Sequence, residues 1–141
     1  MATLEEIRAR FSADRFATET VGIEIREAQP GRAVCALQLR PEHMNAAGIP
    51  QGGAIFTLGD FAFAVSANAF SDRISVSMQH DITYLAPAKG TTLLAESHCV
   101  RCGHSTCFYK VDITDDLGTQ VAFMTVNGFV TNHPAKFEKT S

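Results

Sequence analysis

Residues 45–70, NAAGIPQGGAIFTLGDFAFAVSANAF, decide the fold of this chain. A loop that ends in two adjacent glycines, Gly52 and Gly53, leads into a nearly all-apolar run that a single carboxylate, Asp60, interrupts. The run of about 18 residues is at the short limit for a membrane span, and an acid in its middle would be costly in hydrocarbon. We therefore predict a helix over about 53–70 that is buried inside a soluble protein and makes no membrane contact.

The rest of the chain predicts shorter elements around this helix. Thr3 can form a capping box with Glu6, and the apolar spacing that follows predicts a short amphipathic helix from residue 4 to about 16. The tail from Asn132 is polar and is expected to be loose. Period-two alternation and turn residues predict six strands, at 21–26, 33–40, 74–87, 91–102, 105–116 and 119–131.

Six strands and one very apolar helix imply an α+β fold in which a single antiparallel sheet curls around that helix. The 141 residues are enough for one compact domain and too few for two, so residues 1–141 are expected to form a single domain. Such a sheet leaves its edge strands and a second face uncovered. A homo-oligomer would cover both.

Composition and charge exclude several functional classes. Apolar residues make up 45% and charged residues 19% of the chain, which is typical of a globular protein. The net charge of −3 and the scattered basic residues argue against nucleic-acid binding. The start, MATLEEIRARF, lacks the pattern of a secretory signal, so a cytoplasmic location is expected and the four cysteines do not predict a disulfide framework.

The glycines and the acid together predict a reactive site. The first turn of a helix has unpaired N–H groups and the positive end of the helix dipole, and glycine lets another molecule approach them closely. Asp60 lies about two turns further on, on the face that also carries Thr57, Ala64 and Asn68. A desolvated carboxylate near an anion-stabilising helix start suits attack on an acyl carbonyl. Two plainer readings remain open: the glycines only allow a tight turn, and Asp60 is a structural carboxylate.

These residues also carry a family resemblance. Asn45, Gln51-Gly52-Gly53 and Asp60, in GGAIFTLGDFAFAVSAN, closely resemble acyl-CoA thioesterases of the hotdog fold, in particular the PaaI-like branch of phenylacetate degradation. The segment SVSMQHDITYLAPAKGTTLLAE is similar to the strand after the helix in that family and to its proline-marked turn. The resemblance covers roughly residues 35–131.

The resemblance implies a hotdog fold and hydrolysis of an acyl-CoA substrate without a cofactor or a metal. Two subunits, the minimum unit and half of an expected tetramer, would place Asp60 of one opposite Gly52 of the other. The Gly52 amide would polarise the thioester carbonyl, and Asp60 would be the general base or the nucleophile. Asn45 would hold the carbonyl or the water, and Ser77 matches a position where some relatives carry a water-orienting serine.

One position departs from the family pattern. The family often has HGG where this chain has QGG, and Gln51 cannot titrate near neutral pH as histidine can. Gln51 can still donate and accept hydrogen bonds, so it can orient the loop or the carbonyl. Gly53 and Thr57 are expected to bind substrate beside it. The sequence leaves open whether the acyl group is aromatic or aliphatic.

Three other functions compete with thioester hydrolysis. Cys99-x-x-Cys102, with His98, His104 and Cys107 nearby, looks like half of a zinc site, but on a continuous strand Cys99 and Cys102 would face opposite sides. A non-catalytic acyl-CoA sensor could use the same fold, although a binder has no need of the acid. A hydratase would want a histidine paired with the acid, and the QGG motif offers none there. His43 and His80 are further histidines that could approach the site, although lone histidines more often serve packing or surface roles.

Overall fold

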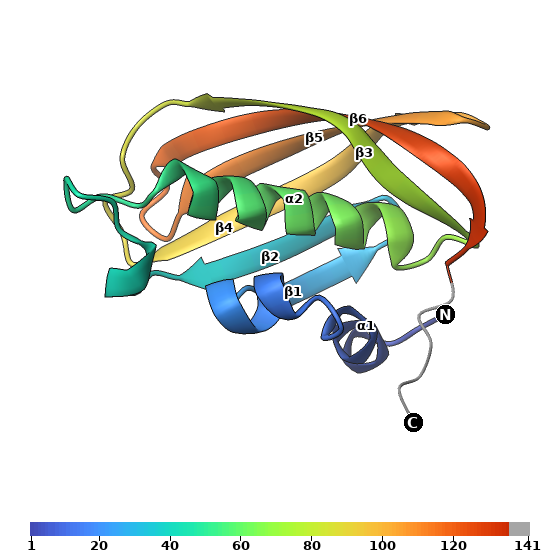
Figure 1. The fold of residues 1–141 in the computed structure, drawn as a ribbon, viewed down its shortest axis with the longest axis horizontal. Helices are drawn as coiled ribbons and strands as arrows, with labels where there is room; N and C mark the ends of the chain where they lie inside the picture. Colours follow the sequence, from blue (N-terminus) through green and yellow to red (C-terminus); the bar gives the residue numbers. More distant parts are fainter. Residues whose placement is uncertain (136–141) are drawn as a thin grey trace.

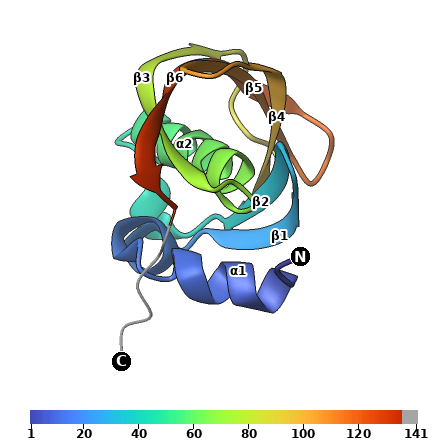
Figure 2. The ribbon, with the colours of Figure 1, turned by 90° about the vertical axis from the view of Figure 1, so that its right-hand side faces the viewer.

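The protein curls one antiparallel sheet around one long helix (Figures 1 and 2). The computed structural model describes residues 1–135. The strand order is β1-β2-β4-β5-β6-β3, so β1 and β3 are the edges of the sheet. This architecture confirms the predicted six-stranded sheet, the central helix and the short N-terminal helix. The strands are β1 (Glu24–Gln29), β2 (Arg32–Gln38), β3 (Arg73–Tyr84), β4 (Thr92–Cys102), β5 (Thr106–Asp115) and β6 (Gln120–Pro134).

The central helix, α2 (Gly52–Asn68), is buried on most of its circumference. Leu58, Phe61 and Val65 are almost fully enclosed by the sheet, which explains why the helix is apolar on nearly every side. Gly59 faces β6, where a Cβ atom would lie 2.9 Å from Cε of Met124, so the missing side chain lets helix and sheet approach closely. No helix within residues 1–135 combines the length and the apolarity needed to cross a membrane.

The N-terminal region differs from the prediction. Helix α1 (Leu4–Phe11), whose start is capped by a hydrogen bond from the Glu6 amide to Thr3 Oγ1, ends at Phe11 rather than near residue 16. A π-helical turn, η1 (Phe16–Val21), follows, and β1 therefore begins at Glu24 rather than at residue 21.

The backbone around Gly22 explains the later start of β1. Gly22 adopts φ = 93°, and the amides of Gly22 and Ile23 both donate to the carbonyl of Ala17. Val21, Ile23 and Ile25 are all buried, so the alternation in the sequence is real, but it spans the end of the turn and the start of the strand.

The C-terminal strand is longer than predicted, and β3 is shorter. β6 continues to Pro134, which pairs with Arg73, so the part of the expected loose tail from Asn132 to Pro134 is strand. The Arg73 guanidinium donates to the carbonyls of Val130 and Thr131 and so holds this last stretch of β6 against β3. β3 ends at Tyr84, short of the predicted end at residue 87. The rest of the expected tail, residues 136–141, lies outside the described residues.

Candidate functional site

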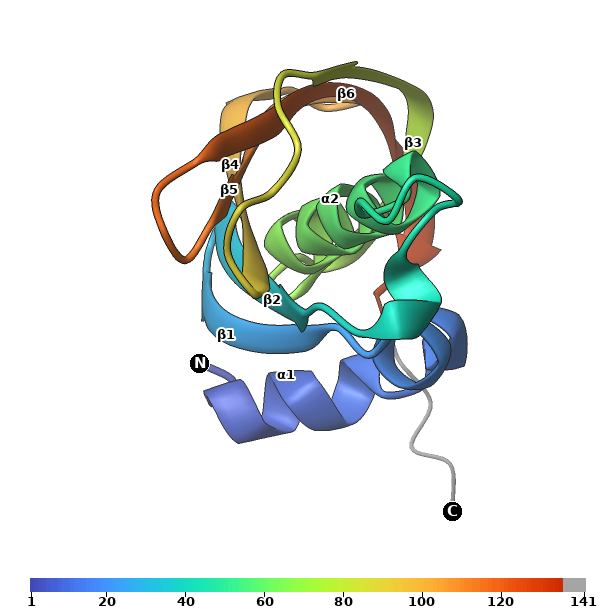
Figure 3. The same cartoon turned by 90° about the vertical axis from the view of Figure 1, so that its left-hand side faces the viewer.

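The start of α2 presents free backbone amides. Gln51 is the N-cap residue, but its side chain makes no capping hydrogen bond, and the first turn contains no acidic residue. Within residues 1–135, the amides of Gly52 and Gly53 donate to no protein acceptor. Figure 3 looks at the molecule from the side on which the loop enters this helix. Two unpaired N–H groups at the positive end of a helix dipole can stabilise negative charge on an oxygen.

A tyrosine from β3 fixes this helix start. The Oη atom of Tyr84 donates a hydrogen bond of 2.8 Å to the carbonyl oxygen of Gly52. Burial raises the pKa of Tyr84 above its ordinary value, which keeps the phenol protonated as a donor. A Cβ atom on Gly52 would lie 2.9 Å from that Oη atom, so an alanine there would push the Tyr84 phenol out of its present position. Tyr84 was not among the residues predicted from the sequence, because only the tertiary structure brings β3 beside Gly52.

Asp60 lies on the stripe of α2 that the sheet leaves open. Its side chain is 47% exposed in the single chain, so the acid that the sequence predicts to be desolvated is half-exposed. Thr57 and Ala64 on the same face are also partly exposed, as predicted. Asn68 is not part of this open stripe: it is buried, and its amide exchanges hydrogen bonds with the backbone of Ser75.

A histidine from β3, one of the two that could approach the site, contacts Asp60. Nε2 of His80, on β3, lies 2.8 Å from Oδ1 of Asp60. The QGG motif supplies no histidine for the acid, but His80 does so from the strand packed beside the helix, so the argument against a histidine–acid pair was wrong. The alternation of His80, Ile82 and Tyr84 along β3 was the available signal, since it predicts that these three side chains share a face.

Asn45 and Gln51 organise the loop before α2. Oδ1 of Asn45 accepts hydrogen bonds from the amides of Ala47 and Ile49, at 2.9 and 3.2 Å, and so closes a tight turn. The backbone amide of Gln51 donates to the carbonyl of His43, while its side chain is exposed. The oxygen of Asn45 is thus engaged in the loop, and the polar group it could offer to a ligand is its NH₂.

Ser77 lies on β3 at the exposed edge of the sheet. It pairs with Gly128 of β6, whereas His80 pairs with Val126. Gly128 and Val126 are two residues apart and share a face. A register shift between Ser77 and Gln79 therefore puts Ser77 and His80 on the same face, although they are three residues apart. One face of β3 thus carries both the Ser77 hydroxyl and the His80 imidazole.

The cysteine region also differs from the prediction. A register shift between Cys99 and Arg101 places Cys99 opposite Tyr109 and Cys102 opposite Cys107. Since Tyr109 and Cys107 share a face of β5, Cys99 and Cys102 also share one, contrary to the expectation for a continuous strand. Within residues 1–135, no three histidine, cysteine or acidic side chains are grouped closely enough to hold a metal ion.

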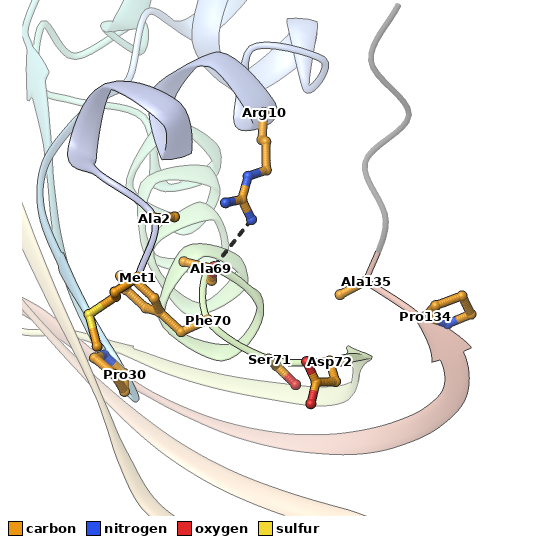
Figure 4. A pocket seen from close by; sticks show the side chains of 10 residues that line it. All are labelled: Met1, Ala2, Arg10, Pro30, Ala69, Phe70, Ser71, Asp72, Pro134 and Ala135. Atoms are coloured by element: carbon orange, nitrogen blue, oxygen red, sulfur yellow. Dashed lines mark hydrogen bonds between the residues drawn. The ribbon is translucent and has the colours of Figure 1, made fainter.

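The hollow drawn in Figure 4 lies at the far end of α2. It has a volume of about 630 Å³, and Arg10 crosses it to donate to the carbonyl of Ala69. Phe70 and Asp72, just after the helix, also line it. The 17 residues of α2 separate this hollow from Gly52 by about 25 Å at 1.5 Å per residue. The hollow is therefore distinct from the candidate site.

The helix start and the acid are too far apart to act on one group within a single chain. Gly52 and Asp60 are separated by eight residues of α2, which is about 12 Å along the axis. A carbonyl group that touches one therefore cannot touch the other within the same chain.

Residues 48–122, which include α2, Asp60 and His80, match the family model described as the thioesterase superfamily. The chain belongs to this superfamily. Acyl-coenzyme A thioesterase 13 from Homo sapiens is 32% identical over 114 residues, which are 79% of this chain and 81% of that protein. The predicted membership of the hotdog thioesterases is therefore confirmed.

Solved structures of thioesterase relatives share the fold. The E. coli PaaI protein from the phenylacetic acid degradation operon superposes with a TM-score of 0.81 over 94% of this chain and 99% of that one, at 22% identity, which supports the likeness in fold. A hypothetical thioesterase from Streptococcus pneumoniae TIGR4, solved with coenzyme A, has a TM-score of 0.74 and 28% identity. That match covers 86% of this chain and 96% of the other.

Proposed function

We propose that this thioesterase hydrolyses acyl-CoA, with Asp60 as the reacting carboxylate and the Gly52 amide as the group that polarises the carbonyl. The observation that carries the proposal is the open stripe of α2. It exposes a carboxylate on the same helix whose first amides have no acceptor within residues 1–135. The names of the human relative and of the coenzyme A-bound streptococcal structure support coenzyme A as the leaving group.

Two copies of the chain would complete the site. The edge strand β3 is 12 residues long and exposes Val76 and Met78, the latter at 60%. An unpaired edge of this kind is a template for strand pairing. Pairing of two β3 edges about a two-fold axis would set the two α2 helices against each other, with Gly52 of one near Asp60 of the other. This dimer is the minimum unit that we propose, and a tetramer of two such dimers would also cover the outer face of the sheet.

In this site the reaction follows from the two groups. Asp60 takes a proton from water as the water oxygen bonds to the carbonyl carbon, and the Gly52 amide binds the oxygen that becomes negative. The carbon–sulfur bond then breaks, the free acid forms, and the proton passes to the coenzyme A thiolate. One amide donor of this kind contributes about 2.7–4 kcal/mol. The direct alternative, attack by Asp60 on the carbonyl, would form an anhydride that water hydrolyses to the same products.

The remaining predicted residues have supporting roles in the proposal. The NH₂ group of Asn45 and the side-chain amide of Gln51 would orient the carbonyl from the entrance loop, and Ser77 would orient the water. Gly53 and Thr57 would line the acyl channel, where Thr57 Oγ1 already donates to the Gly53 carbonyl. The reaction needs no cofactor, and a cytoplasmic location would give access to acyl-CoA.

The test is turnover by the wild type and by Asp60→Asn. Against a panel of aryl and alkyl acyl-CoAs, the wild type should release free thiol, and Asp60→Asn should reduce kcat about 10²- to 10⁴-fold, the range that a general base supplies. Melting curves of both proteins should show that the fold is kept. Undiminished turnover in the variant would remove Asp60 from the chemistry. Coenzyme A binding without turnover in the wild type would indicate the sensor function instead.

A further inference from the structure

His80 is held rigidly beside Asp60. Its side chain is only 9% exposed, and its Nε2 atom lies 2.8 Å from Oδ1 of the acid. The edges of two aromatic rings from α2 enclose the imidazole, with ring-centre separations of 5.0 Å to Phe56 and 5.9 Å to Phe63. On the other side, Nδ1 lies 3.1 Å from the sulfur of Met124 on β6. The ring thus has neighbours from helix and sheet on all of these sides.

The neighbours also fix which ring nitrogen faces the acid as a donor. An ionised carboxylate can only accept hydrogen bonds, so the close approach of Oδ1 is favourable only if Nε2 carries a proton. The tautomer is assigned from these contacts. Nε2 is fully enclosed and has no hydrogen-bond partner of good geometry within residues 1–135. The contact with Asp60 therefore has the distance of a hydrogen bond but not its preferred angles. Catalytic hydrogen bonds are often misaligned in unliganded sites and tighten in the complex.

Three contacts along the seam between α2 and β3 keep this pair in register. Tyr84 binds Gly52 at the helix start, His80 contacts Asp60 in the middle, and Ser75 binds Asn68 at the end. The contacts recur every eight residues on the helix and every four or five on the strand. Eight residues of helix span about 12 Å, and four or five residues of strand span about 13–16 Å, so the spacing of the contacts is similar on the two elements.

We infer that His80 is a positioning residue, whose Nε2–H holds Oδ1 of Asp60 so that Oδ2 faces the attacking water. This inference rests on the proposed function. His80 has too little exposed surface to reach substrate or water itself, so it acts through Asp60, which is half-exposed. A side chain of the sheet thereby fixes the orientation of a carboxylate on the open side of the helix.

The inference predicts a split between kcat and KM. His80→Leu removes the donor and frees the Asp60 carboxylate to rotate. It should lower kcat about 10- to 100-fold, because misplacement of a reacting group by about 1 Å can cost about 10²-fold in rate. KM should change less than about threefold. His80→Gln keeps an N–H at nearly the Nε2 position. It should restore kcat to within about fivefold of the wild type. Equal losses in both variants would overturn the donor role.

A matched control removes an imidazole elsewhere in the sheet. His98 is a half-buried histidine of β4 between Arg32 and Lys110, and it lies on the face of the sheet opposite to Ser97, whose hydroxyl contacts Ser66 of α2. His98→Leu should keep the wild-type kcat, and melting curves should show all three variants folded at the assay temperature. If His98→Leu lowers kcat as much as His80→Leu does, the effect is not specific to the pair and the inference is wrong.

A second readout does not depend on activity. The ¹⁵N chemical shift of an imidazole nitrogen distinguishes N–H from a bare lone pair, and Nε2 of His80 should show the N–H value at neutral pH. A lone-pair value would overturn the inference.

If Asp60→Asn loses turnover while His80→Leu matches the wild type, only the inference fails. If the wild type hydrolyses no acyl-CoA, or Asp60→Asn keeps full turnover, the proposed function fails first, and the ¹⁵N shift still shows separately whether Nε2 is a donor.

Discussion

At the scale of single residues, Asp115 shows how the fold uses a buried acid for structure. Its two oxygens accept hydrogen bonds from four backbone amides, those of Lys89, Gly90, Leu117 and Thr119. Burial alone would raise the pKa of Asp115, but the amides outweigh it and hold the pKa well below the ordinary value. The carboxylate therefore ties the β5–β6 turn to the segment before β4.

Asp115→Asn should lower the melting temperature by several degrees at neutral pH. A group with a lowered pKa in the folded state adds stability above its unfolded pKa, near 3.8, and this stability is lost as the pH falls through the folded value. The difference in melting temperature between the wild type and Asp115→Asn should thus be constant above about pH 5 and shrink below about pH 4. Thermal melts over acidic and neutral pH measure this difference. A difference that grows in acid would contradict the stabilising role of the ionised Asp115 carboxylate.

The sequence singled out Asp60 but revealed neither its contacts nor the structural role of Asp115. Asp60 stood out because it interrupts an apolar run, and the structure places it on an open face of the helix. His80 was named only as a histidine that could approach the site, and its pairing with Asp60 and the contact of Tyr84 with Gly52 were missed, because both depend on which strand packs beside α2. The opposite faces expected for Cys99 and Cys102 were wrong for a related reason, since a one-residue register shift is not visible in an alternating pattern.

At the scale of elements, the seam between α2 and β3 decides whether the site is assembled. α2, which is a long apolar run, and the later strands, which alternate with period two, were predicted close to their observed bounds. The π-helical turn before β1 was not, because its buried residues imitate strand alternation. The seam itself was beyond prediction, since its contacts join elements whose packing no local pattern reveals.

The seam contacts should differ in their contribution to stability. Asn68→Ala leaves the buried amide and carbonyl of Ser75 without their partner and should lower the free energy of unfolding by about 2–4 kcal/mol. Tyr84→Phe removes one contact at an exposed end and should cost about 0.5–1.5 kcal/mol. Urea denaturation monitored by circular dichroism compares the two. A larger loss for Tyr84→Phe would show that the seam is held from the helix start instead.

At the scale of the whole molecule, the proposal depends on two chains that meet along β3. Met78 is exposed on this edge, and Leu117 is exposed on the β5–β6 turn, so the two offer a matched comparison. Met78→Glu should shift the protein to monomers and lower turnover, because a charge on the edge disfavours strand pairing. Leu117→Glu should leave the oligomer and the activity unchanged. Light scattering during size-exclusion chromatography gives the mass of each. A dimer that survives Met78→Glu would place the interface elsewhere.

The most direct test of the shared site mixes two inactive variants. Gly52→Ala, whose Cβ atom would collide with Tyr84, and Asp60→Asn should each be nearly inactive as homodimers. Co-expressed with different affinity tags and purified through both, they form heterodimers in which one site has an intact Gly52 and an intact Asp60 from different chains. The account predicts that acyl-CoA hydrolysis by these heterodimers returns to about half the wild-type kcat per dimer. Heterodimers as inactive as the parent variants would contradict the claim that two subunits build each site.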